Sequence, residues 1–251
     1  MDNVLSVRSG EGDGCTNDQD RRTTILMGCP VNNRAWILGD WFRYAIASAE
    51  KADVDLAFAF VVPFNSEDLE VISEQLGYDR HLILSSEDPK EKRSWNADGF
   101  SKMVELRNQL LGVARSVKPD FFLSVDSDIL LHEDAISNLL ETYETEDCIA
   151  VGGKCYLDFS TVFHPNYAKW TGQTFSRGDF FGVARVDVLM AIKLMSPAAY
   201  NVDYTFHRQG EDFGWSEEAR KCGPLVWDGR IVSKHVMRPR DLEKIDVRCG
   251  Y

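Results

Sequence analysis

Apolar residues along the chain alternate between short continuous runs and longer stretches in which they recur every three or four positions. The continuous runs are typical of strands buried on both faces, and they lie at 23–31, 55–62, 81–85, 121–128 and 148–157. Stretches with helical spacing separate them, at 33–52, 66–77, 101–117 and 132–144. This alternation predicts an α/β fold, with a mostly parallel sheet covered by helices on both faces.

The pattern changes after residue 157, where loops lengthen and aromatic residues become more frequent. We predict strands at 179–185 and 225–237, with a helix at 187–195 between them. These elements indicate a mixed extension of the first sheet.

No stretch of linker composition divides the chain, so we expect one domain over 23–251. Within it, the change of pattern divides the chain into a 23–157 half and a 158–251 half. Residues 1–22 include a polar, Gly- and Asp-rich stretch, which predicts a flexible leader.

Composition narrows the class of protein further. The 251 residues are 44% apolar and 27% charged, as in soluble globular proteins. No apolar run is long enough to span a membrane, and the N-terminus does not resemble a signal peptide. Six scattered cysteines without a CxxC pair favour reduced thiols, so we expect a cytoplasmic protein. The net charge of −12 gives no long-range attraction to nucleic acid.

The stretch FFLSVDSDIL (121–130) places two carboxylates, Asp126 and Asp128, at the end of a predicted buried strand. In parallel α/β sheets, ligands bind beyond the carboxyl ends of the strands. Two carboxylates this close repel one another unless a cation lies between them. A hard divalent ion, Mg²⁺ or Mn²⁺, suits such oxygen ligands, and the alternative is an acidic turn that holds no metal.

Five features in chain order together resemble the nucleotide-sugar glycosyltransferases of the GT-A fold (family 2-like). PVNNR (30–34) resembles the opening nucleotide-binding turn of that family, and LRNQLLGVA (106–114) resembles its "ARN" helix. DSD (126–128) matches the DxD motif, and GEDFGWSEEARKCG (210–223) resembles the ED motif with its following helix. His235, near the end of the last predicted strand, resembles the third metal ligand.

The resemblance implies a metal-dependent transferase of the hexosyltransferase type, with Mn²⁺ or Mg²⁺ as cofactor. It implies a nucleotide-sugar as donor, with a UDP-sugar as the first expectation. It also implies that the 23–157 half binds the nucleotide-sugar and the 158–251 half binds the acceptor. It implies that Asp128 and His235 ligate the metal directly. Asp126 would either ligate the metal through water or bind the ribose hydroxyls. The residues it implies for the nucleotide-sugar are Pro30, Asn33, Arg34, Arg107, Asp126 and Lys234. A surface arginine on an exposed helix face is the alternative for Arg107.

The resemblance also implies the catalytic residues of an inverting reaction. Asp212 would act as general base on the acceptor hydroxyl, and Glu211 is the alternative. A pair of acids stabilising a helix N-terminus would explain the same residues without catalysis.

One departure from the family leaves the nucleotide open. The second strand of the family often ends in an aspartate that holds the nucleotide base, whereas here VVPFNSED (61–68) offers only Asn65 and Asp68.

Two other classes of protein fit part of this pattern. The haloacid-dehalogenase-type phosphatases carry their DxD on the first strand, so we discount them, and a catalytically silent GT-A binding module remains the non-enzyme alternative.

The acceptor is the least specified partner. Small viral GT-A enzymes that glycosylate hydroxymethylated pyrimidines in DNA resemble this chain in size and layout, so hydroxymethylated DNA is our first expectation. Basic residues for a DNA groove occur in ARSVK (114–118), AKW (168–170), SRGDFF (176–181) and SKHVMRPR (233–240). A glycan, a lipid or a small molecule is the alternative acceptor, which the acidic net charge mildly favours.

Overall fold

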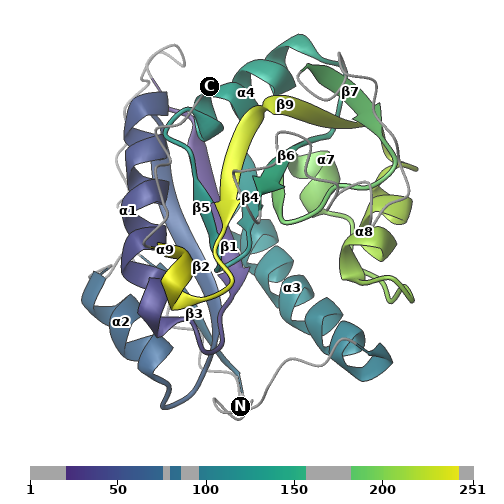
Figure 1. The fold of residues 1–251 in the computed structure, drawn as a ribbon. Helices are drawn as coiled ribbons and strands as arrows, with labels where there is room; N and C mark the ends of the chain where they lie inside the picture. Colours follow the sequence, from purple (N-terminus) through teal and green to yellow (C-terminus); the bar gives the residue numbers. More distant parts are fainter. Residues whose placement is uncertain (1–20, 76–79, 86–95, 157–181, 243–251) are drawn as a thin grey trace, which may run out of the picture.

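The computed structural model describes residues 21–75, 80–85, 96–156 and 182–242 of the chain (Figure 1). Most of the predicted leader, at 1–20, lies outside these residues, as do the basic segments at 168–170 and 176–181.

The described residues form a sheet of nine strands. The strands are β1 (Thr24–Pro30), β2 (Asp55–Pro63), β3 (Arg80–Ser85), β4 (Phe121–Val125), β5 (Ile129–Leu131), β6 (Ala150–Tyr156), β7 (Val183–Val186), β8 (Ile192–Met195) and β9 (Leu225–His235). Their order is β3-β2-β1-β4-β8-β6-β9-β5, and β7 pairs with β9 outside this path. The first four strands of this order are parallel, and β8 is antiparallel to both of its neighbours.

Helices cover both faces of the sheet (Figure 1). They are α1 (Ala35–Ala52), α2 (Glu67–Gln75), α3 (Ala97–Val117), α4 (Ala135–Thr145), α7 (Pro197–Tyr200), α8 (Glu211–Ala219) and α9 (Pro239–Leu242). Helices α1 and α4 pack in one apolar cluster, whereas α3, α7 and α8 pack in a second. No helix among these is long and apolar enough to cross a membrane.

Alternation within single strands explains why there are two clusters. In β1, Ile25 and Met27 point towards α1, and Leu26 points towards α3. In β4, Leu123 joins the α1 cluster and Phe122 joins the α3 cluster. Successive strand residues face opposite sides, so a strand buried on both faces must be apolar throughout. The predicted α/β class with a mostly parallel sheet in its N-terminal half is confirmed.

The predicted helix at 187–195 is wrong, because this segment contains strand β8. Its Lys193 lies opposite Ser124 of β4 and Gly152 of β6, so the segment completes the middle of the sheet. Seven apolar residues within the nine positions 187–195 fit a helix or a short buried strand equally well, and pairing with β4 and β6 decides between them.

Strand β9 brings His235 beside the segment that follows β4. It runs parallel to β6 and antiparallel to β5, with His235 opposite Ile129. The predicted strand at 121–128 ends earlier than expected, at Val125, so both aspartates lie in the turn between β4 and β5. The last residue of β9 therefore lies beside that turn.

Candidate functional site

Backbone hydrogen bonds fix the turn that carries Asp126 and Asp128. The N–H of Asp126 donates to the carbonyl of Ala191 at 3.1 Å. The carbonyl of Asp126 accepts from the N–H of Ile129 at 3.0 Å and from the indole Nε1 of Trp41 at 3.1 Å. The turn is thus held from β8 and from α1, with its two side chains at the carboxyl end of β4.

Arg107 of α3 binds the first carboxylate of this turn. Its side chain is 2% exposed, so the alternative of a surface arginine is wrong. Its Nη2 donates to Asp126 Oδ1 at 2.6 Å, its Nη1 to Ser124 Oγ at 3.1 Å and its Nε to Glu211 Oε1 at 3.2 Å. Burial lowers the pKa of Arg107, but the charges of Asp126 and Asp212 more than offset this and keep its pKa well above the usual range.

Asp128 has two basic neighbours from different parts of the chain. Arg34 Nη2 donates to Asp128 Oδ2 at 2.9 Å, and His235 Nε2 lies 3.4 Å from Asp128 Oδ1. Burial raises the pKa of Asp128, but His235 and Arg34 together lower it to about 2. Burial lowers the pKa of His235, and the hydrogen bond and charge of Asp128 outweigh this and raise it.

The second acidic motif begins helix α8 and is buried. Glu211 is 4% exposed and is held by Arg107, as described above. Asp212 is 8% exposed, and its Oδ1 accepts from Lys193 Nζ at 2.6 Å. Stabilisation of a helix N-terminus alone does not account for Glu211 and Asp212, because each also pairs with a buried cation, Arg107 or Lys193.

Lys193 is not among the site residues expected from the sequence. Its local signal is a single lysine within the apolar run MAIKLM (190–195), whose spacing predicts a helix. A lysine in a strand buried on both faces needs a buried anion, and such an anion is a reason to inspect the acids nearby.

The site therefore contains four carboxylates, and each has at least one cationic partner. The pairs are Asp126 with Arg107, Asp128 with Arg34 and His235, Glu211 with Arg107, and Asp212 with Lys193. Arg107 joins the DxD turn directly to the acidic start of α8.

The turn after β1 is shaped by α2. The backbone N–H groups of Asn33 and Arg34 each donate to Asp68 at 2.7 Å, and Asp68 is buried. Asp68 therefore holds the turn after Pro30, and its two oxygens are engaged there. Asn33 adopts φ 57°, the left-handed region that asparagine tolerates better than most residues.

Lys234 lies beside His235 in sequence but on the other side of β9. Its Nζ donates to the backbone carbonyl of Asp241 in α9 at 2.9 Å, and its side chain is buried. Neighbouring residues of a strand point to opposite faces, so Lys234 does not share the surroundings of His235.

Two adjacent side chains, those of Asp128 and His235, are the candidate ligands for a metal ion. Within the described part of the chain, no three His, Cys, Asp or Glu side chains are placed to hold a metal ion. Asp128 Oδ1 and His235 Nε2 are 3.4 Å apart, comparable to the roughly 3 Å between neighbouring ligands of a small hard cation. Asp126 faces Arg107 instead, and Arg34 occupies the other oxygen of Asp128.

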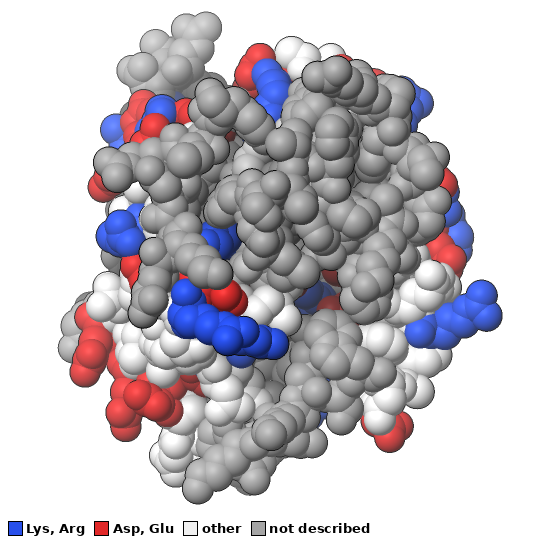
Figure 2. Space-filling view, in the orientation of Figure 1, with Lys and Arg blue, Asp and Glu red and all other residues white. Residues whose placement is uncertain are grey.

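Charged side chains are scattered over the face of the molecule that Figure 2 shows. Acidic side chains gather over α2, whose Glu67, Glu70 and Glu74 are exposed. The described Lys and Arg side chains on this face are separated by uncharged surface and by residues drawn in grey.

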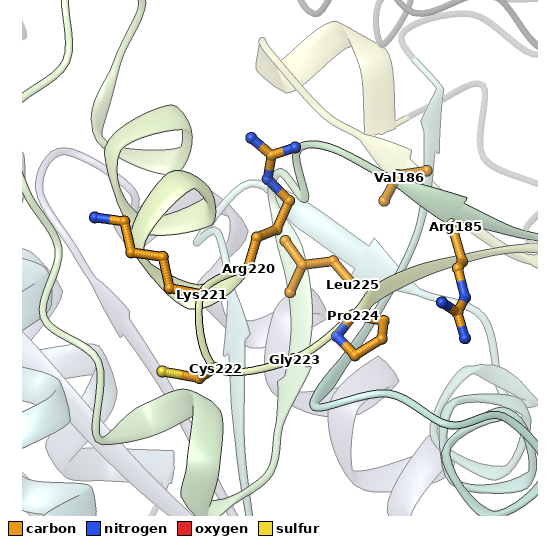
Figure 3. A pocket seen from close by; sticks show the side chains of 8 residues that line it. All are labelled: Arg185, Val186, Arg220, Lys221, Cys222, Gly223, Pro224 and Leu225. Atoms are coloured by element: carbon orange, nitrogen blue, oxygen red, sulfur yellow. The ribbon is translucent and has the colours of Figure 1, made fainter.

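A cavity of about 510 Å³ lies at the far end of β9 from His235. Arg185, Arg220 and Lys221 line it, together with Cys222 and neighbouring residues. Their charged ends point away from one another, so they do not converge on one ligand (Figure 3).

No family model matches the sequence, and no curated protein matches it. Solved structures do match the fold. S. aureus TarS 1–349 in complex with UDP-GlcNAc has a TM-score of 0.58 and 11% identity, covering 91% of this chain and 61% of TarS 1–349. A mycobacterial protein matches with a TM-score of 0.52 and 16% identity, covering 87% of this chain and 68% of its own. This chain spans less than two thirds of TarS 1–349, and the likeness shows a shared α/β fold of the GT-A class.

Proposed function

We propose that the protein is a glycosyltransferase that moves a sugar from a nucleotide-sugar to an acceptor hydroxyl. The observation that carries this proposal is the connection of two acidic motifs through one buried arginine. Arg107 holds Asp126 of the DxD turn and Glu211 of α8 at the carboxyl ends of the parallel strands, where ligands bind in such sheets.

The fold of TarS, crystallised with UDP-GlcNAc, supports a UDP-sugar as donor. Arg34 supports a binding site for the diphosphate of that donor. Its Nη2 is bound to Asp128, whereas its Nε is buried with no hydrogen-bond partner among the described residues. A buried hydrogen-bond donor of this kind needs a hydrogen-bond acceptor, and a phosphate oxygen suits it. The other residues proposed to bind the nucleotide-sugar are Pro30, Asn33, Arg107 and Lys234. Lys234 would act indirectly, through its hydrogen bond to the segment after β9.

We extend the proposal to a divalent cation, Mn²⁺ or Mg²⁺, held by Asp128 and His235, with Asp126 contributing through water or binding the ribose. When bound, the cation would neutralise the charge that develops on the leaving diphosphate. The chain's own part is to release Arg34 from Asp128 and to present a neutral His235, because an imidazolium cannot ligate a metal.

The start of α8 supplies the proposed base. Asp212 takes the proton of the acceptor hydroxyl as that oxygen attacks the anomeric carbon, and Glu211 is the second candidate. Attack in line with the leaving diphosphate inverts the configuration of the sugar.

For the acceptor we propose the hydroxymethyl group of a modified pyrimidine in DNA. Three exposed arginines support it: Arg238 and Arg240 follow β9 directly, and Arg208 precedes α8. Arg115 does not contribute, since it lies near the end of α3 that leads into the start of β4, at the opposite edge of the sheet from Asp126. Binding through a few phosphate contacts falls steeply with salt. Absence of binding to plain and hydroxymethylated duplexes at low salt would return the acceptor to a glycan, lipid or small molecule.

The proposal places the reaction in the cytoplasm. Cys29, Cys148 and Cys222 are free thiols in the described residues, which is compatible with a reducing compartment.

The deciding experiment is a screen of nucleotide-sugars, including UDP-GlcNAc, for binding and hydrolysis with and without Mn²⁺. We expect a UDP-sugar to bind and to be hydrolysed slowly with Mn²⁺, and Asp128→Asn to lose both properties. Asp187→Asn, an exposed acid of the loop before β8, is the matched control and should behave like the wild type. Binding without turnover towards any acceptor would identify a silent binding module, and absence of binding would reject the transferase.

A further inference from the structure

Lys193 places an ammonium group in the middle of the sheet. Strand β8 lies between β4 and β6, and Lys193 is opposite Ser124 and Gly152 in these strands. Its side chain is 0% exposed. Removing an ammonium from water is costly, so such a lysine persists only with a well-placed anion.

Asp212 is that anion. Lys193 Nζ lies 2.6 Å from Asp212 Oδ1 and 5.7 Å from the centre of the Tyr204 ring. Burial lowers the pKa of Lys193, but the charge of Asp212 outweighs it and raises the pKa. Burial likewise raises the pKa of Asp212, whereas Lys193 and Arg107 lower it below its ordinary value. Both groups are therefore charged at neutral pH.

A second contact orients the same carboxylate. The N–H of Ala191 donates to Asp212 Oδ2 at 3.4 Å, and the carbonyl of Ala191 accepts from the N–H of Asp126 at 3.1 Å. Ala191 has φ 51°, a left-handed conformation that is unfavourable for alanine. The strained turn before β8 thus connects the backbone of the DxD turn with the side chain of Asp212.

We propose that Lys193 is a positioning residue for the transfer reaction, which holds the Asp212 carboxylate in one orientation towards the acceptor hydroxyl. The proposal rests on the glycosyltransferase function proposed above. The groups that face Asp212 are Lys193 from β8, the Ala191 backbone from the turn before β8, Arg107 from α3, Tyr204 from the segment before α8, and Glu211 from α8 itself. Lys193 is the cation that contacts Asp212 directly, since Arg107 hydrogen-bonds to Asp126 and Glu211.

Lys193→Met tests this role, because methionine nearly keeps the length of the side chain and removes its charge. Without Lys193 the burial of Asp212 is opposed less, so its pKa rises. We expect the acid limb of the pH profile of UDP-GlcNAc hydrolysis to move up by at least about one unit. We expect kcat at pH 7, where the Asp212 carboxylate is still ionised after such a shift, to fall about tenfold because the orientation of the carboxylate is lost, with KM for the donor unchanged.

Lys193→Arg and Lys221→Met complete the set. Lys193→Arg keeps the charge and should stay close to the wild-type pH profile, which keeps the test valid if Lys193→Met does not fold. Lys221→Met removes an exposed lysine of the same half and should change nothing. A profile that moves equally in Lys193→Arg, or that stays fixed in Lys193→Met while only stability falls, would overturn the positioning role.

A readout independent of activity separates this inference from the proposed function. Carboxyl carbon NMR titration of the full-length protein reports Asp212 directly, and Asp212→Asn assigns its resonance. We expect Asp212 to titrate below its ordinary range in the wild type and higher in Lys193→Met. Identical titration in both proteins would contradict the inference, whatever the outcome for transferase activity. Absence of any donor hydrolysis in the wild type would instead contradict the proposed function.

Discussion

Arg34 Nη2 lies 2.9 Å from Asp128 Oδ2, so the second carboxylate of the DxD turn has a cationic partner from the turn after β1. The carboxylates of the turn are therefore neutralised by the chain itself, Asp126 by Arg107 and Asp128 by Arg34, with His235 beside Asp128. A divalent cation that uses Asp128 must compete with Arg34. The diphosphate of a donor offers Arg34 an alternative partner.

Arg34→Gln should therefore increase the affinity for Mn²⁺ in the absence of donor. The expected gain is roughly tenfold, the size of one lost hydrogen bond between charged groups. The same variant should bind a UDP-sugar more weakly, because the diphosphate loses a cationic contact. Calorimetric titration with Mn²⁺ alone, and then with donor at saturating Mn²⁺, measures both effects.

The matched control for Arg34 is Arg43→Gln. Arg43 lies on α1, and its exposed side chain pairs with Asp40, away from the site. It should leave both titrations unchanged. If Arg34→Gln also leaves Mn²⁺ affinity unchanged, Arg34 and the cation do not compete for Asp128.

Arg107→Met should destabilise the fold strongly. Its removal leaves the buried Glu211 and the partly buried Asp126 without their cation, and breaking a buried ion pair from one side costs about 3–5 kcal/mol. Urea unfolding measures the difference. Arg115→Met of the same helix removes a more exposed ion pair with Asp203 and should cost about 1 kcal/mol or less. Equal losses in the two variants would show that the buried network adds no special stability.

The sequence predicted the fold well where one interaction decided the structure. Continuous apolar runs predicted β1, β2, β3, β4 and β6, because a strand covered on both faces must be apolar throughout. The segment with β8 was predicted as a helix, since its place depends on pairing with strands far away in the chain. Apolar spacing over a few residues carries no information about such distant partners.

The acids of the site were easier to find than their partners. Asp126 and Asp128 stand out because charge directly after a buried strand is unusual. The cations come from β8, from α3 and from the turn after β1, and nothing local indicates that Lys193 meets Asp212. Only the assembled sheet brings them together, which is why the sequence did not predict that Arg107 and Arg34 pair with the two carboxylates.

Acid should weaken the contact between the starts of β1 and β4. Asp120 accepts hydrogen bonds from the N–H and the hydroxyl of Thr24, both at 2.7 Å, and pairs with Arg21 at 3.0 Å. Burial raises the pKa of Asp120, but these partners lower it below its ordinary value of 3.8. Its contribution to the free energy of unfolding is therefore fully present above about pH 4. That contribution is lost as the pH falls through the lowered pKa.

Asp120→Asn should thus be less stable than the wild type at pH 7, by on the order of 2 kcal/mol, the size of a few hydrogen bonds to a charged group. The difference between the two proteins should shrink as the pH falls below 4. Urea unfolding at several pH values measures it. Asp203→Asn, an exposed acid, should show a much smaller difference, and a constant gap for Asp120→Asn across this range would refute the assignment.

Asp212→Asn should separate donor binding from chemistry. Asparagine keeps the size of the side chain but cannot take a proton, so the chemical step should slow by roughly 10²- to 10⁴-fold, the usual contribution of a general base. The donor contacts proposed for Arg34 and Asp128 lie elsewhere, so UDP-sugar affinity should stay unchanged. Rapid-quench transfer under single-turnover conditions and calorimetric binding measure the two quantities. Glu218→Gln, with a more exposed acid on the same helix, is the control and should retain both.

The configuration of the product tests the same assignment from the chemical side. A base on the acceptor side of the sugar, opposite the leaving diphosphate, requires in-line attack, so the wild-type product should have the anomeric configuration opposite to that of the donor. Proton NMR of the first product formed decides this. Retention of configuration would exclude the inverting mechanism. Weaker donor binding in Asp212→Asn would instead place Asp212 in the donor pocket, and Glu211, held by Arg107 at 3.2 Å, would be the remaining candidate for the base.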